Sequence, residues 1–182
     1  MKAAAVILGD FATVKGKNLR AVGAALSFSA FPQQPLEIWS FCQWRGESFL
    51  LPRCNLTQLA EAEVLPDGAQ CAAFLEKLVA AQKVSLVFLP GGMLCNEVAA
   101  RLAVRTGGSV FTDVTAVRQL SPEAVTVERE IYGYNLNGCF TSSRWPVFIT
   151  LSDGFAEKEF APGPVEEKTV FPLPPPKGVR RG

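Results

Sequence analysis

Histidine is absent from this chain of 182 residues, and its absence excludes several kinds of active site. Without imidazole there is no Ser-His-Asp or Cys-His nucleophile pair, no HExxH zinc protease and no histidine-ligated metal. An excess of positive charge is also lacking, because 18 Lys and Arg residues face 17 Asp and Glu residues and leave a net charge of +1. We therefore expect no nucleic-acid partner, since such partners bind basic surfaces.

Metal-binding cysteine pairs and long apolar runs are missing as well. The five cysteines contain no CxxC pair that could begin a zinc or iron–sulfur site, so we predict scattered buried thiols and no metal. No run approaches the roughly 20 apolar residues of a membrane helix. The N-terminus lacks the long apolar region and the cleavage site of a signal peptide. These features predict a cytoplasmic protein without membrane insertion.

What the chain does contain is 48% apolar and 19% charged residues, which is typical of a compact folded domain. Continuous apolar runs at residues 3–8 and 85–89 predict strands buried on both faces of a parallel sheet. Some other segments carry apolar residues at helical spacing, and others are rich in residues that favour strands. These predict helices over residues 19–26, 70–82 and 96–106, and further strands over 36–42 and 109–112. A short helix over 55–62, with Asn55 as its N-cap, is a further expectation.

The pattern changes after residue 113. Four short β-rich runs, at 116–120, 125–132, 138–142 and 147–151, are separated by turn signals and predict antiparallel strands. The two halves together predict an α/β fold, a three-layer sandwich with a mainly parallel sheet, Rossmann-like or adenine nucleotide alpha hydrolase-like, plus an antiparallel β extension.

The C-terminal segment has a different composition. Residues 160–182 hold six of the thirteen prolines and end in Arg-Arg-Gly, which favours extended polyproline II. We therefore expect an α/β domain over residues 1–159 and a proline-rich linker or tail over residues 160–182.

Glycine and polar residues follow three of the predicted parallel strands, at the edge where α/β folds bind ligands. The candidate nucleotide-binding residues at this edge are Gly9 and Asp10, Gly91 and Gly92, and Thr112 and Asp113. The sequence PGGMLCNE lacks the third glycine of a dinucleotide motif and the Lys-Ser/Thr pair of a P-loop. A tight turn, a solvated turn and a local cap are therefore the structural alternatives at these three places.

Two further clusters could carry chemistry. The run Glu128-Arg129-Glu130 resembles an acid–base cluster, but alternation along a strand places the glutamates on one face and Arg129 on the other, as in a solvated strand face. Cys95 lies at a predicted helix start, where a positive dipole lowers the pKa of a thiol. No base is near it in the sequence, so a buried structural thiol is the alternative. No catalytic residue is identified.

Four segments resemble, in the same order, the N-terminal domain of the electron transfer flavoprotein alpha subunit, in its bacterial branch. They are SLVFLPGG, NEVAARLAVRTGGSVFTDVTAV, EREIYGYN and WPVFITLSDGFAE, within residues 85–157. The resemblance implies an electron carrier, a heterodimer of alpha and beta subunits. Such a carrier takes electrons from flavin dehydrogenases, such as the acyl-CoA dehydrogenases of fatty acid oxidation, and passes them to a respiratory acceptor through bound FAD.

The resemblance also implies where the cofactors lie. The family's FAD sits mainly in a C-terminal domain of the alpha subunit, so a chain ending at Gly182 is expected to act as a scaffold that pairs subunits. The family's beta subunit holds a structural AMP, which makes AMP conceivable here by analogy. Where family members often carry a Thr-Gly-Arg-like signal, this chain has Gly91-Gly92-Met93, so an arginine contact is not carried over.

Three functional hypotheses remain open at this stage. The first is a pairing domain whose apolar surface, between the strands at 116–132 and 146–151, docks a beta-like subunit or a second copy. Substituting Tyr132 or Trp145 with Asp tests that surface. The second is a stand-alone adenine-nucleotide-binding module. The third is a fragment of a longer protein whose function belongs to the whole.

Overall fold

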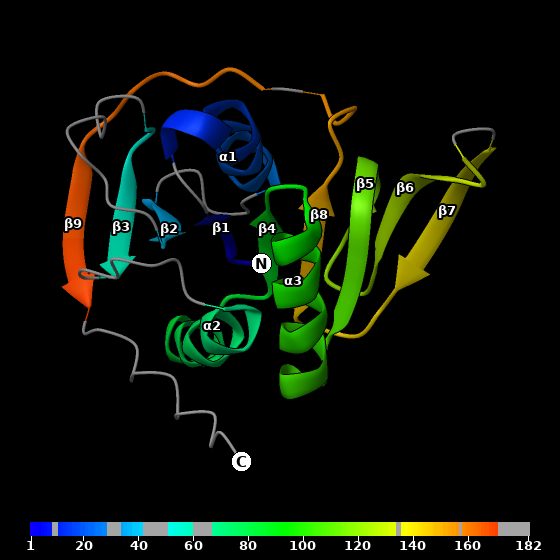
Figure 1. Ribbon diagram of the computed structural model, residues 1–182, viewed down its shortest axis with the longest axis horizontal. Helices are drawn as coiled ribbons and strands as arrows, with labels where there is room; N and C mark the ends of the chain where they lie inside the picture. The colour runs from blue at the N-terminus through cyan, green and yellow to red at the C-terminus, as the bar shows by residue number, and fades with distance from the viewer. Residues whose placement is uncertain are drawn as a thin grey trace, which may run out of the picture.

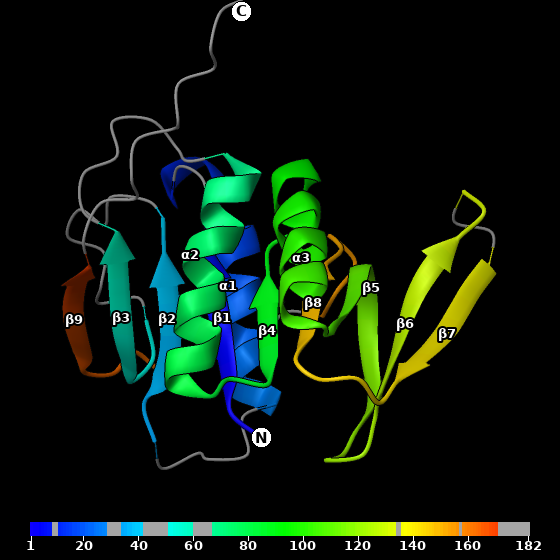
Figure 2. The ribbon, with the colours of Figure 1, turned by 90° about the horizontal axis from the view of Figure 1, so that it is seen from below.

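The computed structural model describes residues 1–8, 11–28, 34–41, 51–59, 67–133, 136–156 and 158–170. These residues form a nine-stranded mixed sheet with helices on both faces (Figures 1 and 2). The strands are β1 Ala3–Ile7, β2 Leu36–Ser40, β3 Cys54–Leu59, β4 Leu86–Leu89, β5 Ser109–Leu120, β6 Val125–Ile131, β7 Leu136–Ser142, β8 Val147–Leu151 and β9 Val165–Val170. The helices are α1 Phe11–Phe28, α2 Gly68–Gln82 and α3 Met93–Thr106.

The strand order is β7-β6-β5-β8-β4-β1-β2-β3-β9. The neighbouring strands in the part β5-β8-β4-β1-β2-β3-β9 pair in parallel. The pairs β5 with β6 and β6 with β7 are antiparallel. This arrangement confirms the predicted three-layer α/β fold with an antiparallel extension. None of the three described helices is long and apolar enough to cross a membrane.

Two hydrophobic cores lie on opposite faces of the sheet. In β1, Ala3, Ala5 and Ile7 pack with residues of α1, whereas Ala4 and Val6 pack with residues of α2 and α3. Figure 1 shows α1 on one side of the sheet and α2 and α3 on the other. The continuous apolar run of β1 follows from this arrangement, because a strand covered on both faces buries every side chain.

The predicted helix over residues 55–62 is wrong, because residues 54–59 form β3. This strand lies between β2 and β9 and pairs in parallel with both. Asn55 does not cap a helix: its side-chain amide donates to the Glu37 carboxylate in β2 at 3.1 Å. The alternate residues Cys54 and Leu56 are buried in the same core as residues of α1. Pairing with two strands and this burial therefore outweigh the weak helical pattern of the segment.

The last predicted antiparallel strand is also wrong in direction. Residues 147–151 form β8, which lies between β4 and β5 and is parallel to both, with Val147 opposite Leu86 and Ser109. All five residues of β8 are buried. Val147, Ile149 and Leu151 pack in the core with α1 and Phe148 packs in the core with α2 and α3, as in a central parallel strand that is covered on both faces.

Part of the proline-rich segment belongs to the sheet. Residues 165–170 form β9, so the polyproline II prediction is wrong for them. The prolines of the segment lie outside this strand, and Pro164 accepts a hydrogen bond from the Cys54 backbone amide at 3.2 Å just before it begins. The sheet therefore continues beyond the expected boundary at residue 159, and the division into a domain and a tail stays a prediction. Residues 171–182 lie outside the described part of the chain.

The antiparallel extension consists of the second half of β5 together with β6 and β7. Figure 2 shows β6 and β7 standing beyond the helices at one end of the sheet. Val125 and Val127 are fully buried on its inner face, in the same core as α1. The extension is thus joined to the body through a continuous core while its far side remains open.

Candidate functional site

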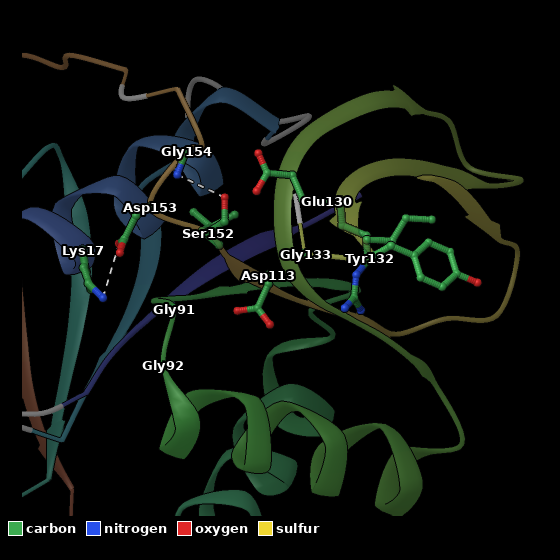
Figure 3. Close-up of a pocket in the computed structure, with 13 residues that line it drawn as sticks. Lys17, Gly91, Gly92, Asp113, Glu130, Tyr132, Gly133, Ser152, Asp153 and Gly154 are labelled. Atoms are coloured by element: carbon green, nitrogen blue, oxygen red, sulfur yellow. Dashed lines mark hydrogen bonds and ion pairs between the residues drawn. The ribbon is translucent and has the colours of Figure 1, made fainter. Parts of the chain in front are cut away.

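A cleft of about 720 Å³ lies between the body of the sheet and the antiparallel extension (Figure 3). It opens at the carboxyl ends of β4 and β8, beside Asp113 in the first half of β5, and this is the edge at which α/β folds bind ligands. Gly91, Gly92 and Asp113 line it, so the structure brings three of the six predicted edge residues together. Thr112 lies next to this lining, and residues 9 and 10 lie outside the described residues.

The Gly91–Gly92 turn is explained by packing. A Cβ at position 91 would lie 2.2 Å from the Leu151 carbonyl oxygen in β8, so only glycine permits this close approach. Gly92 has φ +130° and ψ 163°, a conformation essentially restricted to glycine. Gly92 is also the N-cap of α3 and gives the helix no side-chain cap. Both glycines are therefore required by the backbone, whatever the cleft holds.

Asp113 is held in place by a network that joins three elements. Its backbone N–H donates to the Thr150 hydroxyl of β8 at 3.0 Å. That hydroxyl donates to the Asn96 side-chain oxygen of α3 at 2.6 Å. The Asn96 amide nitrogen then donates to both carboxylate oxygens of Asp113, at 3.2 and 3.4 Å. Figure 3 shows Asp113 between the glycine turn and Tyr132.

The charges that line the cleft do not favour a phosphate-bearing ligand. Three carboxylates, those of Asp113, Glu130 and Asp153, lie with two cations, Lys17 and Arg129. Lys17 is paired with Asp153 at 3.3 Å. Arg20 also pairs with Asp153, at 3.4 Å, so three carboxylates meet three cations and the described residues of the cleft carry no excess of positive charge for the diphosphate of FAD or the phosphate of AMP.

Arg129 is a lining residue that the sequence did not single out as a site residue. Its Nη1 donates to the Thr112 hydroxyl at 3.0 Å, and its buried Nε has no hydrogen-bond partner within the described residues. Its neighbour Glu128 faces the other way and accepts a hydrogen bond from Arg118, which lowers the pKa of that carboxyl. Glu130, however, lines the cleft together with Arg129, so the predicted separation of both glutamates from Arg129 holds for Glu128 alone.

Of the two interpretations of Cys95, the buried structural thiol is confirmed and activation by the helix start is not. Cys95 is buried, and that burial raises its thiol pKa to about 12, far above the range of a nucleophile at neutral pH. Burial likewise raises the thiol pKa of Cys54 and Cys71 to about 12. Cys139 on β7 is the exposed thiol among the four described.

Large apolar side chains are exposed on the antiparallel extension. They are Tyr132, Leu136 and Phe140, at 78%, 56% and 40% exposure. Tyr132 also lines the cleft, so the cleft and this apolar surface are continuous. Trp145, the other predicted surface residue, instead packs against the core with its indole nitrogen buried.

Comparisons with known proteins agree with the resemblance drawn from the sequence. The family model described as the electron transfer flavoprotein domain matches residues 58–173, more than half of the chain. No curated protein matches the chain.

Proposed function

This chain belongs to the electron transfer flavoprotein family, and we propose that within it the chain is an alpha-type subunit that pairs with a beta-type subunit through its antiparallel extension. Its part in electron transfer is to position a partner and not to carry out chemistry. The observation that supports this most directly is the open edge of β7 beside an exposed apolar surface.

The two edges of the sheet differ in a way that favours pairing at β7. The outer strand at one end, β9, carries Glu166, Glu167 and Lys168, all exposed. Charged residues on an edge strand hinder the addition of a further strand. β7 at the other end has the sequence LNGCFTS and no charge. Its outer backbone N–H and C=O groups are therefore available to a partner strand without a charge to be buried.

The apolar face of this edge is built around Phe140. In the pairing register Phe140 lies opposite Val127 and Leu136 lies opposite Ile131, so the four side chains share one face of the hairpin. A Cβ at Gly138 would come within 2.8 Å of the Phe140 ring, which shows that the ring lies over this glycine. Phe140 and Leu136 thereby form a flat apolar platform at the open end of the sheet, of the kind that interfaces bury.

The flavin chemistry of the family is assigned to other parts of the assembled protein. Because the lining of the cleft does not suit a diphosphate, we propose that this domain does not bind FAD on its own. It would instead hold the beta-type subunit in a fixed position relative to the flavin. Electron donors such as acyl-CoA dehydrogenases and a respiratory acceptor belong to this proposal and follow from the family resemblance.

The pairing proposal is tested by light scattering of the purified chain, alone and mixed with the beta-type electron transfer flavoprotein subunit of the same organism. We expect a complex with that subunit, and we expect Tyr132→Asp and Phe140→Asp to weaken it by about tenfold or more. Val104→Asp is the matched control, since Val104 is 85% exposed on α3, away from the extension. Equal weakening by the control, or unchanged pairing in both extension variants, would contradict the proposal. A second copy docking in place of the beta-type subunit would show as a dimer of the chain alone.

The alternative, an adenine-nucleotide module at the sheet edge, predicts a different result. Titration calorimetry with AMP and ATP should then give saturable binding that Asp113→Ala and Gly92→Ala weaken. A visible spectrum of the purified chain tests at the same time for bound flavin. Because the described residues of the cleft carry no excess of positive charge, we expect neither ligand.

A further inference from the structure

Strand β5 changes partner halfway along its length. Its first residues pair in parallel with β8, and from Val114 onward it pairs antiparallel with β6. The register with β8 shifts between Phe111 and Val114, so Thr112 and Asp113 form an irregularity at the change of partner. Bulges of this kind bend a strand and increase its twist. Thr112 and Asp113 therefore lie where the extension leaves the body, ahead of two further register shifts, between Val114 and Ala116 and between Val117 and Gln119, in the pairing of β5 with β6.

Asp113 adopts the left-handed conformation, with φ +54°. A side chain is unfavourable there, although Asp tolerates it better than most residues because its short polar group can hydrogen-bond locally. The bonds to Asp113 come from other elements, from Thr150 in β8 and Asn96 in α3, at 3.0–3.4 Å. Thr150 is fully buried, so loss of its hydroxyl would remove a hydrogen-bond partner that is fixed in the core from the Asp113 N–H.

Thr112, the other residue of the irregularity, is hydrogen-bonded through its side chain to the extension. Thr112 accepts a hydrogen bond from Arg129 at 3.0 Å, and Arg129 belongs to β6, in the extension. One bulge residue is thus bonded to the extension and the next is bonded to the body. The Val114 carbonyl, directly after them, accepts a hydrogen bond from Ser152 at 3.0 Å and closes the base of the extension.

We propose that Asn96 and Thr150 are positioning residues that hold Asp113 left-handed and thereby set the angle of the extension relative to the sheet. We call this pair the hinge clamp. On the proposed function, the hinge clamp fixes where the partner subunit is held, although neither residue lies on the pairing surface. Asp113 is then a structural hinge residue and not a ligand-binding carboxylate.

The test compares matched variants by two readouts. Residual dipolar couplings of backbone amides give the orientation of β6 and β7 relative to β1 and β4 in the chain alone, and titration with the beta-type subunit gives the affinity. Thr150→Val removes the hydroxyl at nearly constant volume, whereas Thr150→Ser retains it. We expect Thr150→Val and Asn96→Ala to change the orientation beyond the error of the wild-type fit and to weaken pairing by about tenfold. Thr150→Ser should restore both.

A buried variant far from the hinge separates positioning from general destabilisation. Val79→Ala removes packing from the core that contains residues of α2 and α3, and Val79 takes no part in the hinge clamp. It should lower the melting temperature without changing the orientation of the extension. The inference is overturned if Thr150→Val leaves the orientation unchanged, or if Val79→Ala turns the extension as much. If the wild-type chain does not pair at all, the proposed function fails, yet the dipolar couplings still decide whether the hinge clamp sets the angle.

Discussion

Replacing Gly91 with alanine should destabilise the protein more than any other single methyl group added at the cleft. A Cβ at this position would lie 2.2 Å from the Leu151 carbonyl oxygen, far inside the 3.4 Å at which ordinary van der Waals contact begins. The opposing atom is backbone in a central strand, so it cannot rotate away as a flexible side chain would. Relief of the clash requires β4 and β8 to separate at their carboxyl ends.

The size of the effect follows from what overpacking usually costs. Forced insertion of a methyl group into packed structure costs about 1–3 kcal/mol, and a backbone obstacle places Gly91→Ala at the upper end. Gly92→Ala meets no atom within 4 Å, but its φ of +130° makes it unfavourable by about 1–3 kcal/mol. Both losses are smaller than the roughly 5–15 kcal/mol by which domains are stable, so the variants should still fold.

Urea denaturation measures these differences directly. With a slope of about 2 kcal/mol per molar, a loss of 3 kcal/mol lowers the urea midpoint by about 1.5 M. Gly16→Ala is the matched control, because Gly16 lies in the interior of α1 with no atom near its missing Cβ. It should raise stability by about 0.5–1 kcal/mol. A Gly91→Ala midpoint equal to that of the wild type would refute the packing explanation. Nucleotide binding would then be the remaining explanation for glycine at this turn.

Two further predictions concern the cysteines. In a native protein at pH 8, iodoacetamide should modify Cys139 well before Cys54, Cys71 or Cys95, as peptide mass spectrometry can follow; early modification of Cys95 would contradict its burial. The second prediction concerns alkaline pH. Burial raises the pKa of the three buried thiols from 9.0 to about 12 in the folded state, so their contribution to the free energy of unfolding is intact below pH 9 and is lost as pH rises toward 12. Urea midpoints between pH 8 and pH 10 should fall less steeply in a Cys71→Ala variant, and an identical slope would count against the prediction.

Predictions from the sequence succeeded where burial alone determines structure. β1 and β4 are apolar on both faces because helices cover both sides of the sheet, and this leaves an unmistakable run in the sequence. β3 gives no such run: Asn55, Thr57 and Gln58 alternate with apolar residues, and the segment reads equally well as one side of a helix. What makes it a strand is pairing with β2 and with β9, a segment more than 100 residues later in the chain.

The cleft was predictable only in part, for a related reason. The rule that ligands gather at the carboxyl ends of parallel strands correctly brings Gly91, Gly92 and Asp113 together. Asn96 and Thr150 could not be found in this way. Their contact with Asp113 exists because β8 lies between β4 and β5, and the turn-rich sequence before β8 indicated an antiparallel strand instead.

The position of β8 also fixes the extension to the body of the sheet, as the proposed pairing requires. The chain leaves the parallel part of the sheet along β5, adds β6 and β7 at its edge, and then returns as β8 between β5 and β4. The extension is therefore connected to the body through two neighbouring strands of the sheet, β5 and β8, and not through a single linker. β8 supplies the Leu151 carbonyl that requires Gly91, the Thr150 hydroxyl that holds Asp113, and a direct continuation to Ser152, which bonds Val114. On the proposed function, a partner subunit bound to β7 would thus be held in a fixed position relative to the core.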